Sequence, residues 1–341
     1  MAPTGWLDVH THFFPPLTDA QAEGMAQALR NGNFMVSASS LHWNVENIIQ
    51  YNDSASVQMS LLSYLPYPHE KLRAANDLGH NIVKKYPQRF GQLVGLPTDD
   101  TEACLSEIRR VEQWDLRPDG FATTTLYNQV PLSDPRLERV WEVLNRQHAV
   151  VHIHPNAYVA GTYGKPSPLI DVAFDTARVA TDMLYKGVFR RFPNIKFIFA
   201  HCGGALPALS GRISLLGTES WVPNPENLTR EEIEEQLSSL YIDTAATAKT
   251  GLAPAANMVG IGHCLYGSDC GVPCSTPRTM NENKKDVEAF ERRQGLLAGT
   301  IAKNTWELFP AAAKRAEQGG PLITDEQCLL FSTTTQSTWA S

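Results

Sequence analysis

The sequence has little that is typical of a secreted, membrane-spanning or nucleic-acid-binding protein. Its 341 residues include six cysteines without a Cys-x-x-Cys pair, so a dense disulfide framework is not expected. No apolar run reaches the length of about 18 residues that a membrane span needs. The net charge is −7 and no stripe of Lys or Arg stands out, which argues against nucleic acid as a partner. Met1 to Gly5 lead directly into an apolar segment, so a cytoplasmic protein without a signal peptide is expected.

The composition is that of a globular protein with a large core. Hydrophobic residues make up 43% of the chain and charged residues 19%. The length suits one barrel of alternating strands and helices, which takes about 250 residues plus insertions. We therefore expect one barrel domain over residues 1–310 and a C-terminal extension or tail over residues 311–341.

Short apolar runs that can form buried strands alternate with segments of helical periodicity, and this predicts an α/β protein with a parallel sheet. The eight runs lie near residues 6–9, 57–65, 90–96, 120–124, 150–153, 196–200, 240–244 and 265–268. Helices are expected at 18–30, 44–52, 70–85, 101–114, from 134, and at 171–192, 206–216, 229–238 and 284–309. The long excursion after the first strand is expected to cover the mouth of the barrel like a lid.

Four of the runs end at a residue type that binds metals. His10 and His12 follow the first run and share a face of the strand, His154 ends the fifth, His201 the sixth and Asp269 the eighth. A barrel brings the C-terminal ends of its strands to one rim, so these side chains are expected to converge. Histidine and carboxylate ligands suit a divalent cation.

Two assignments within this set stay open from the residues alone. His152 shares a face with His154, so it is the reserve for the third histidine ligand. His201 is either a further ligand or an acid or base held near the metal, and the second role is favoured because a histidine titrates near neutral pH.

The motifs together resemble those of the amidohydrolase superfamily, in its aminocarboxymuconate semialdehyde decarboxylase-like branch. They lie at residues 8–12, 152–155, 197–207 with 211–214, and 266–269. The resemblance implies a distorted (β/α)₈ TIM barrel that holds one divalent metal, zinc or manganese, without an organic cofactor. By position, the family's metal ligands match His10, His12, His154 and Asp269, and its catalytic histidine matches His201.

The resemblance also implies a homodimer. Arg212 stands where this branch places an arginine that reaches into the neighbouring subunit's active site and holds a substrate carboxylate. A helix-surface arginine without that role is the alternative.

This sequence differs from the branch at positions that affect which substrate is expected. No Lys or Arg occurs between Arg30 and Lys71, where the muconate semialdehyde enzymes carry a second carboxylate-binding arginine, so a dicarboxylate is disfavoured. The opening at residues 8–16 is similar to that of fungal 6-methylsalicylate decarboxylases. This resemblance implies non-oxidative decarboxylation of a small aromatic carboxylate, 6-methylsalicylate, to 3-methylphenol and carbon dioxide in polyketide secondary metabolism.

Aromatic side chains near the motifs are candidates for contact with the substrate ring: Phe13, Phe14, Trp43 and Tyr158, for each of which ordinary packing is an equal explanation. Either His201 or Asp269 is expected to deliver the proton in a decarboxylation. The alternative function is a metal-dependent hydrolase of a lactone or a related carbonyl substrate, because the same site would activate water.

Overall fold

The computed structural model describes residues 3–157 and 161–318. Eight parallel strands follow one another around a barrel in chain order, as the alternation of runs predicts. They are β1 (Trp6–His12), β2 (Val57–Ser63), β3 (Phe90–Gly95), β4 (Gly120–Thr124), β7 (Val150–His154), β8 (Lys196–Phe199), β9 (Tyr241–Asp243) and β10 (Cys264–Leu265).

The barrel closes between its first strand and the segment after its last one. The N–H of Val9 donates to the carbonyl of Tyr266 over 3.0 Å, and the N–H of His12 donates to that of Cys270 over 2.7 Å. In the other direction, the N–H of Asp269 donates to the carbonyl of His10 over 3.0 Å. The expected (β/α)₈ architecture is therefore confirmed.

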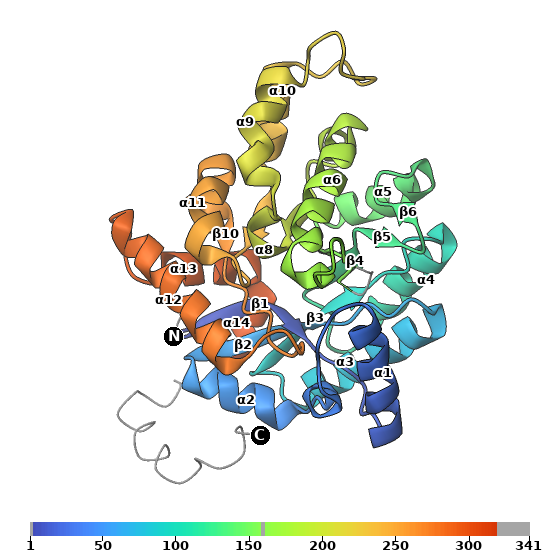
Figure 1. Cartoon of the computed structure of the whole chain (residues 1–341), viewed down its shortest axis with the longest axis vertical. Helices are drawn as coiled ribbons and strands as arrows, with labels where there is room; N and C mark the ends of the chain where they lie inside the picture. Colours follow the sequence, from blue (N-terminus) through green and yellow to red (C-terminus); the bar gives the residue numbers. More distant parts are fainter. Residues whose placement is uncertain (1–2, 158–160, 319–341) are drawn as a thin grey trace.

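Helices surround the strands on the outside (Figure 1). They are α1 (Asp19–Asn31), α2 (Val45–Ser54), α3 (His69–Lys85), α4 (Thr101–Val111), α5 (Glu138–Arg146), α6 (Asp171–Tyr185), α7 (Val188–Arg191), α8 (Ala200–Gly203), α9 (Leu206–Leu216), α10 (Arg230–Ser238), α11 (Ala248–Val259), α12 (Pro277–Arg293), α13 (Thr300–Leu308) and α14 (Pro310–Glu317). Short 3₁₀ turns are η1 (Ala38–Leu41), η2 (Pro135–Leu137), η3 (Ser167–Leu169) and η4 (Ile261–His263), and β5 (Leu126–Tyr127) with β6 (Val130–Pro131) forms a small hairpin.

Two of the expected helices are each divided in the structure. The segment 284–309 is not one helix, because α12 ends at Arg293 and α13 begins at Thr300. Gly295 and Gly299 between them have φ values of 66° and 80°, which glycine adopts without strain. The segment 171–192 is divided in the same way at Gly187, with φ 65°. No helix was predicted from the sequence at the position of α11.

The last described helix closes the end of the barrel opposite the strand ends that carry the metal-binding residue types. Trp306, Phe309 and Ala312 belong to one buried cluster with barrel residues such as Leu7 and Leu61. The carbonyl of Ala316 in α14 also accepts a hydrogen bond from Gln58 Nε2 over 3.2 Å. Residues 311–317 therefore pack against the barrel as part of α14. Residues 319–341 lie outside the described part of the chain.

Helix α14 is anchored by an ion pair that is almost fully buried. The Arg315 guanidinium donates to both carboxylate oxygens of Asp119, at 2.8 and 3.1 Å, and to the carbonyl of Pro87 at 3.2 Å. The side chains of Arg315 and Asp119 are 12% and 2% exposed. Asp119 also accepts the backbone N–H of Gln92 at the start of β3, so the contact joins α14 to the strand layer.

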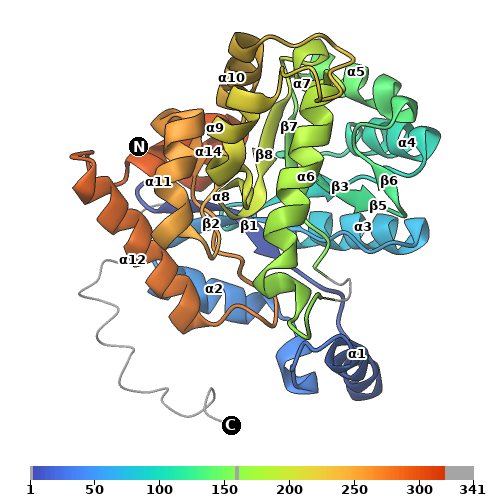
Figure 2. The same cartoon turned by 45° about the horizontal axis from the view of Figure 1, so that its top comes forward.

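The excursion after β1 forms a small unit that stands apart from the barrel, at the lower right of Figure 2. Its helix α1 buries Ala22 and Ala26 against Val36 and Leu41 in a cluster separate from the main core. Closure of this segment over the barrel mouth stays a prediction.

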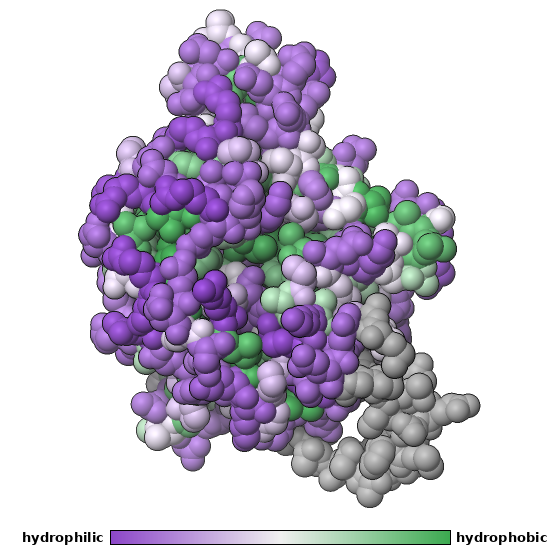
Figure 3. All heavy atoms as spheres, turned by 180° about the vertical axis from the view of Figure 1, so that it is seen from behind, coloured by the Kyte–Doolittle hydropathy of each residue, from purple (hydrophilic) through white to green (hydrophobic). Residues whose placement is uncertain are grey.

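The face shown in Figure 3 is mostly hydrophilic, with apolar atoms gathered in a few separate areas. The cysteines at 104, 202, 264, 270 and 274 are free thiols, in agreement with the sequence. Within residues 3–157 and 161–318, no helix combines the length and the apolar composition that crossing a membrane requires.

Replacement of Arg315 by Ala is expected to destabilise the fold strongly, because it leaves the Asp119 carboxylate buried without its partner. Loss of one member of a buried ion pair lowers the free energy of unfolding by about 3–5 kcal/mol. Urea unfolding followed by circular dichroism measures this change. Exposed Lys314 on the same helix is the matched control, and Lys314→Ala is expected to stay within about 0.5 kcal/mol of the parent. Equal stability of the two variants would contradict the role of α14.

Candidate active site

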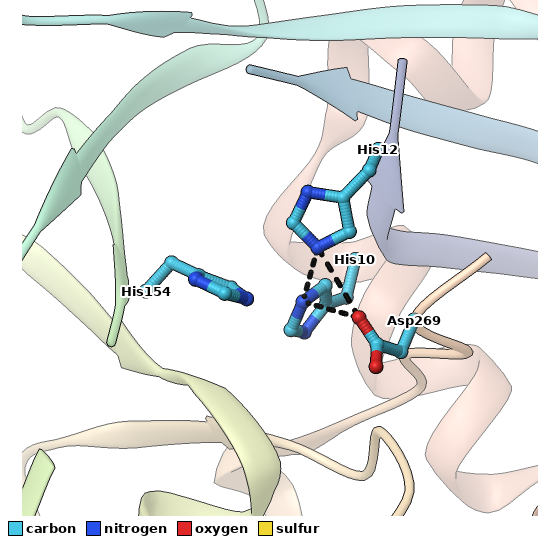
Figure 4. A group of neighbouring side chains, drawn as sticks. All are labelled: His10, His12, His154 and Asp269. Carbon is cyan, nitrogen blue, oxygen red and sulfur yellow. Dashed lines mark hydrogen bonds and ion pairs between the residues drawn. The ribbon is translucent and has the colours of Figure 1, made fainter. Parts of the chain in front are cut away.

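Three histidines and one carboxylate meet at the C-terminal end of the barrel. His10 and His12 come from β1, His154 from the end of β7, and Asp269 from the segment after β10. One ligand atom from each lies within 4.8 Å of the others. His10 Nε2 is 3.1 Å from His12 Nε2 and 3.4 Å from Asp269 Oδ1, while His12 Nε2 is 3.2 Å from Asp269 Oδ1. Figure 4 shows the four side chains converging from three sides.

The state of His154 shows that the cluster fits a cation. Its Nδ1 is 2.7 Å from the carbonyl of Pro155, which fixes the ring, while its Nε2 is buried and has no hydrogen-bond partner among the described residues. An orphaned buried nitrogen is unfavourable unless a ligand satisfies it. Because this ring points toward His10, His12 and Asp269, a metal held by all four would supply the missing partner (Figure 4).

Burial also favours the protonation states in which these side chains can bind a metal. It lowers the pKa of His10 to about 4 and that of His154 well below its usual value, so both rings are neutral near pH 7. Burial opposes ionisation of Asp269, but a hydrogen bond from His12 and the nearby His10 and His201 rings lower its pKa to about 2. Neutral imidazoles and an ionised carboxylate are the forms that bind divalent cations.

His201 lies beside this cluster but is not part of it. Its ring centroid is 4.9 Å from that of His10 and 5.5 Å from that of His154. Its Nδ1 is 3.2 Å from the carbonyl of Ala245. Of the two roles open at the sequence level, this placement supports the acid or base beside the metal.

The backbone around His201 is unusual. Four successive residues, from His201 to Gly204, have positive φ values of 58°, 56°, 74° and 60°. A side chain at Gly204 would bring a Cβ within 2.3 Å of the carbonyl oxygen of Ala173, so glycine is required there. Asp269 has φ 64° as well. In residues other than glycine, here His201, Cys202 and Asp269, a left-handed conformation costs about 1–3 kcal/mol, and such residues cluster at functional sites.

Asp243 at the end of β9 is the main residue that the sequence interpretation missed. Its Oδ2 is 2.9 Å from His10 Nδ1 and 2.8 Å from His152 Nε2. Its Oδ1 accepts the backbone N–H groups of His201 and Ala245 over 3.1 and 2.9 Å. Burial alone would raise the pKa of Asp243, but the two histidine rings hold it well below its usual range.

These contacts also separate the two histidines of β7. His152 is fully buried and bonded to Asp243, behind the cluster, whereas His154 faces it. His154 is therefore the better placed ligand, as the sequence interpretation favoured. A carboxylate at the end of the seventh predicted strand was the signal for Asp243, since the four candidate ligands and His201 also follow predicted apolar runs.

Asp8 is the second residue that the sequence interpretation missed, and it lies on β1 two residues before His10. It is fully buried, and its oxygens accept the backbone N–H groups of His10 and Ser268 over 3.0 Å each and the Thr11 hydroxyl over 2.8 Å. Burial raises the pKa of Asp8 to about 6, although these hydrogen bonds oppose the shift. Asp8 thereby joins the loop that carries Asp269 to the strand that carries His10.

A cavity of about 740 Å³ opens beside the cluster, with His12, His154, His201 and Asp269 in its wall. Its aromatic wall residues are Phe14, Phe34, Tyr64 and Tyr67. Of these, Phe14 was expected from the sequence, whereas Phe34, Tyr64 and Tyr67 were not.

Two of the expected aromatic contacts lie elsewhere. Phe13 is 1% exposed and packs against Trp43 and Tyr64 in the core, while Trp43 donates from Nε1 to the carbonyl of His12 over 3.0 Å. Both residues therefore support the wall from behind. Tyr158, the remaining expected contact, lies outside the described residues.

Arg212 is not among the residues of its own chain that form the wall of this cavity. It lies on the exposed side of α9, in the outer layer of helices, and does not line the cavity. Its expected reach into a second subunit is compatible with this position and stays a prediction.

The fold and the cluster define a barrel enzyme with a candidate mononuclear metal centre at the C-terminal ends of its strands. Comparison with known proteins agrees: the amidohydrolase family matches residues 7–310, so the chain belongs to that family.

Individual relatives cover nearly the whole chain. A 6-methylsalicylic acid decarboxylase of Penicillium expansum is 30% identical over 323 residues, which are 89% of this chain and 96% of the relative. A decarboxylase of Penicillium terrestre is 28% identical, with 89% and 94% covered. A dihydroxybenzoic acid decarboxylase from a Polaromonas species, solved with manganese and the inhibitor 2-nitroresorcinol, superimposes with a TM-score of 0.71 at 20% identity, over 91% of this chain and 98% of that one.

Removal of His154 is expected to abolish stabilisation by metal. Metal at 100 times its dissociation constant stabilises a native protein by about 2.7 kcal/mol, because it binds the folded state only. The chelator-stripped protein is therefore expected to melt at a higher temperature when zinc or manganese is restored, and His154→Ala is expected to lose this response. Differential scanning calorimetry measures it. His42 is exposed on the excursion, and His42→Ala is the control that should respond like the parent. A full response in His154→Ala would contradict the assignment.

Proposed function

We propose that this protein is a metal-dependent carboxy-lyase that decarboxylates an aromatic hydroxy acid without oxidation, with 6-methylsalicylate as substrate and 3-methylphenol and carbon dioxide as products. The observation that carries the proposal is the cluster of His10, His12, His154 and Asp269 with His201 beside it, opening into a cavity that can hold an aromatic acid. The fungal relatives named as decarboxylases support the reaction class, and one of them is named for this substrate.

The proposed cofactor is one zinc or manganese ion per chain. When bound, the ion would supply positive charge that orients the carboxylate and phenol oxygens of the substrate and stabilises the phenolate. The four ligand side chains need no organic cofactor for this chemistry.

The residues also suggest the source of the proton. In the reaction a proton adds to the ring carbon that bears the carboxylate, the bond to that carboxylate breaks, and its electrons restore the aromatic ring as carbon dioxide leaves. Asp269 has Oδ1 directed at His10 and His12, and its Oδ2 accepts the Ser275 hydroxyl over 3.0 Å. His201 has Nδ1 held at the Ala245 carbonyl, which leaves Nε2 to carry the proton. His201 is therefore the proposed proton donor.

The cavity wall fits a small substrate with a single carboxylate. Lys249 is the one Lys or Arg among the described residues that line it, and the excursion after β1 contributes Phe14 and Phe34 rather than a cation. A second carboxylate on the substrate would lack a partner on that side.

The proposed assembly is a homodimer formed through the outer face of α6 and α9. Helix α9 exposes Leu209 and Leu215, and Phe174 on the adjacent α6 is 44% exposed. Exposed apolar side chains on neighbouring helices are typical of protein interfaces. Arg212 lies on the same helix and would meet the substrate carboxylate in the partner's cavity.

The direct test is release of carbon dioxide from 6-methylsalicylate, with salicylate and orsellinate as comparisons, by the metal-loaded protein. His201→Asn is expected to lower kcat by about 10²–10⁴-fold while metal content stays constant, because a proton-transfer group is lost. Hydrolysis of a lactone without decarboxylation of any of the three acids would overturn the proposal in favour of a hydrolase.

A mixed dimer tests the role of Arg212. Arg212→Ala and His201→Asn homodimers are both expected to be nearly inactive. In a purified heterodimer one site keeps its own His201 and receives the intact Arg212 of the partner, so roughly half of the wild-type activity should return. Differently tagged, co-expressed chains give this heterodimer. No recovery would contradict a shared site, and a monomer in gel filtration would contradict the dimer itself.

A further inference from the structure

Asp243 contacts several parts of the reactive site at once. A single buried carboxylate meets two histidine rings through Oδ2 and two backbone N–H groups through Oδ1. We propose that Asp243 is a positioning residue that sets the tautomer of His10 and the orientation of His201, and so prepares the metal site and the proton-transfer group together. The inference rests on the metal site of the proposed function.

The contact with His10 determines which ring nitrogen is free. An ionised carboxylate accepts hydrogen bonds and has no proton to donate, so His10 must carry its proton on Nδ1 at 2.9 Å from Asp243. The lone pair is then on Nε2. That atom lies among the other ligands, at 3.1 Å from His12 Nε2 and 3.4 Å from Asp269 Oδ1. A carboxylate behind a ligating histidine is a recurrent way of fixing a metal site.

The contact with His201 works through a closed set of hydrogen bonds. Asp243 Oδ1 accepts the N–H of His201 over 3.1 Å and that of Ala245 over 2.9 Å. The carbonyl of the same Ala245 lies 3.2 Å from His201 Nδ1. Because Ala245 O is an acceptor, Nδ1 carries a proton in either charge state of the ring. Asp243 thus holds both the strained backbone of His201 and the residue that orients its imidazole.

A second cation among His10, His152 and Asp243 is the competing explanation, since their ligand atoms also lie close together. Their separations argue against it. The two histidine nitrogens are 2.9 and 2.8 Å from the same oxygen, Asp243 Oδ2, which are ordinary hydrogen-bond lengths. The other oxygen is already satisfied by two backbone donors. The carboxylate therefore acts as an acceptor, and one metal per chain is expected.

Asp243→Asn tests the proposal with almost no change in shape. The amide oxygen can still accept from the two backbone N–H groups, but its NH₂ group then faces His10 Nδ1 and His152 Nε2. His10 can accept this donor only if its proton moves to Nε2, where it competes with the metal. We expect zinc affinity, measured by competition with a chromophoric chelator, to fall about 10- to 100-fold.

Two controls separate positioning from a general structural role. Asp119→Asn makes the same chemical change at a buried carboxylate at the opposite end of the barrel, so it is expected to lose stability but to keep zinc affinity. The unaltered zinc-loaded protein, labelled with ¹⁵N-histidine, is expected to show His10 as the Nδ1–H tautomer in NMR spectra. This measurement does not depend on the folding of any variant.

The outcomes are distinct. If the unaltered protein binds no metal, the proposed function fails, and this inference with it. If it binds one zinc and Asp243→Asn binds equally tightly, or if His10 carries its proton on Nε2, the inference alone is overturned. Two zinc ions per chain with loss of one in Asp243→Asn would replace it with a second metal site.

Discussion

The active end of this barrel depends on the hydrogen bonds of Asp8, which hold the first strand and the segment after the last strand together. Asp8 and Ser268 are 260 positions apart, yet the carboxylate accepts both the N–H and the hydroxyl of Ser268. The candidate ligands His10 and His12 lie two and four residues after Asp8, and Asp269 lies immediately after Ser268. The distance between these ligands is therefore set by the same contact that closes the barrel, so closure of the fold and assembly of the metal site are one event.

Two buried carboxylates position the residues of the site, each in a different way. Asp8 bonds to backbone N–H groups and hydroxyls and fixes where the strands lie, whereas Asp243 bonds to two imidazoles and fixes how the rings are turned. Transfer of a carboxylate into the protein interior is strongly unfavourable unless donors surround it, and both residues are fully surrounded. They explain how ligands from separate strands are held in one geometry.

The sequence predicted those features that depend on periodicity and on strand ends. All eight strands and the convergence of His10, His12, His154 and Asp269 follow from short apolar runs and from the geometry of parallel barrels. The aromatic wall was predicted only in part: Phe14 lines it and Phe13 does not, because the choice between them depends on which face of an irregular segment turns inward. Asp8 and Asp243 were missed because an important partner of each, Ser268 for Asp8 and His10 for Asp243, lies more than 200 residues away, although the strand-end position of Asp243 was a local signal.

The position of α14 has a consequence for how the chain is made. A ribosome releases the chain from its N-terminus, and the helix that closes the base of the barrel is among the last described parts to emerge. Until then, Asp119 cannot form its ion pair, because Arg315 lies 196 positions later in the chain. The histidines of β1 likewise lack their contact with Asp269 until that residue has been translated. The nascent chain therefore exposes unpaired strands for most of its synthesis, a state that favours association with other chains. The four residues of the candidate metal site can meet only after Asp269 has been translated, when most of the described elements have already emerged.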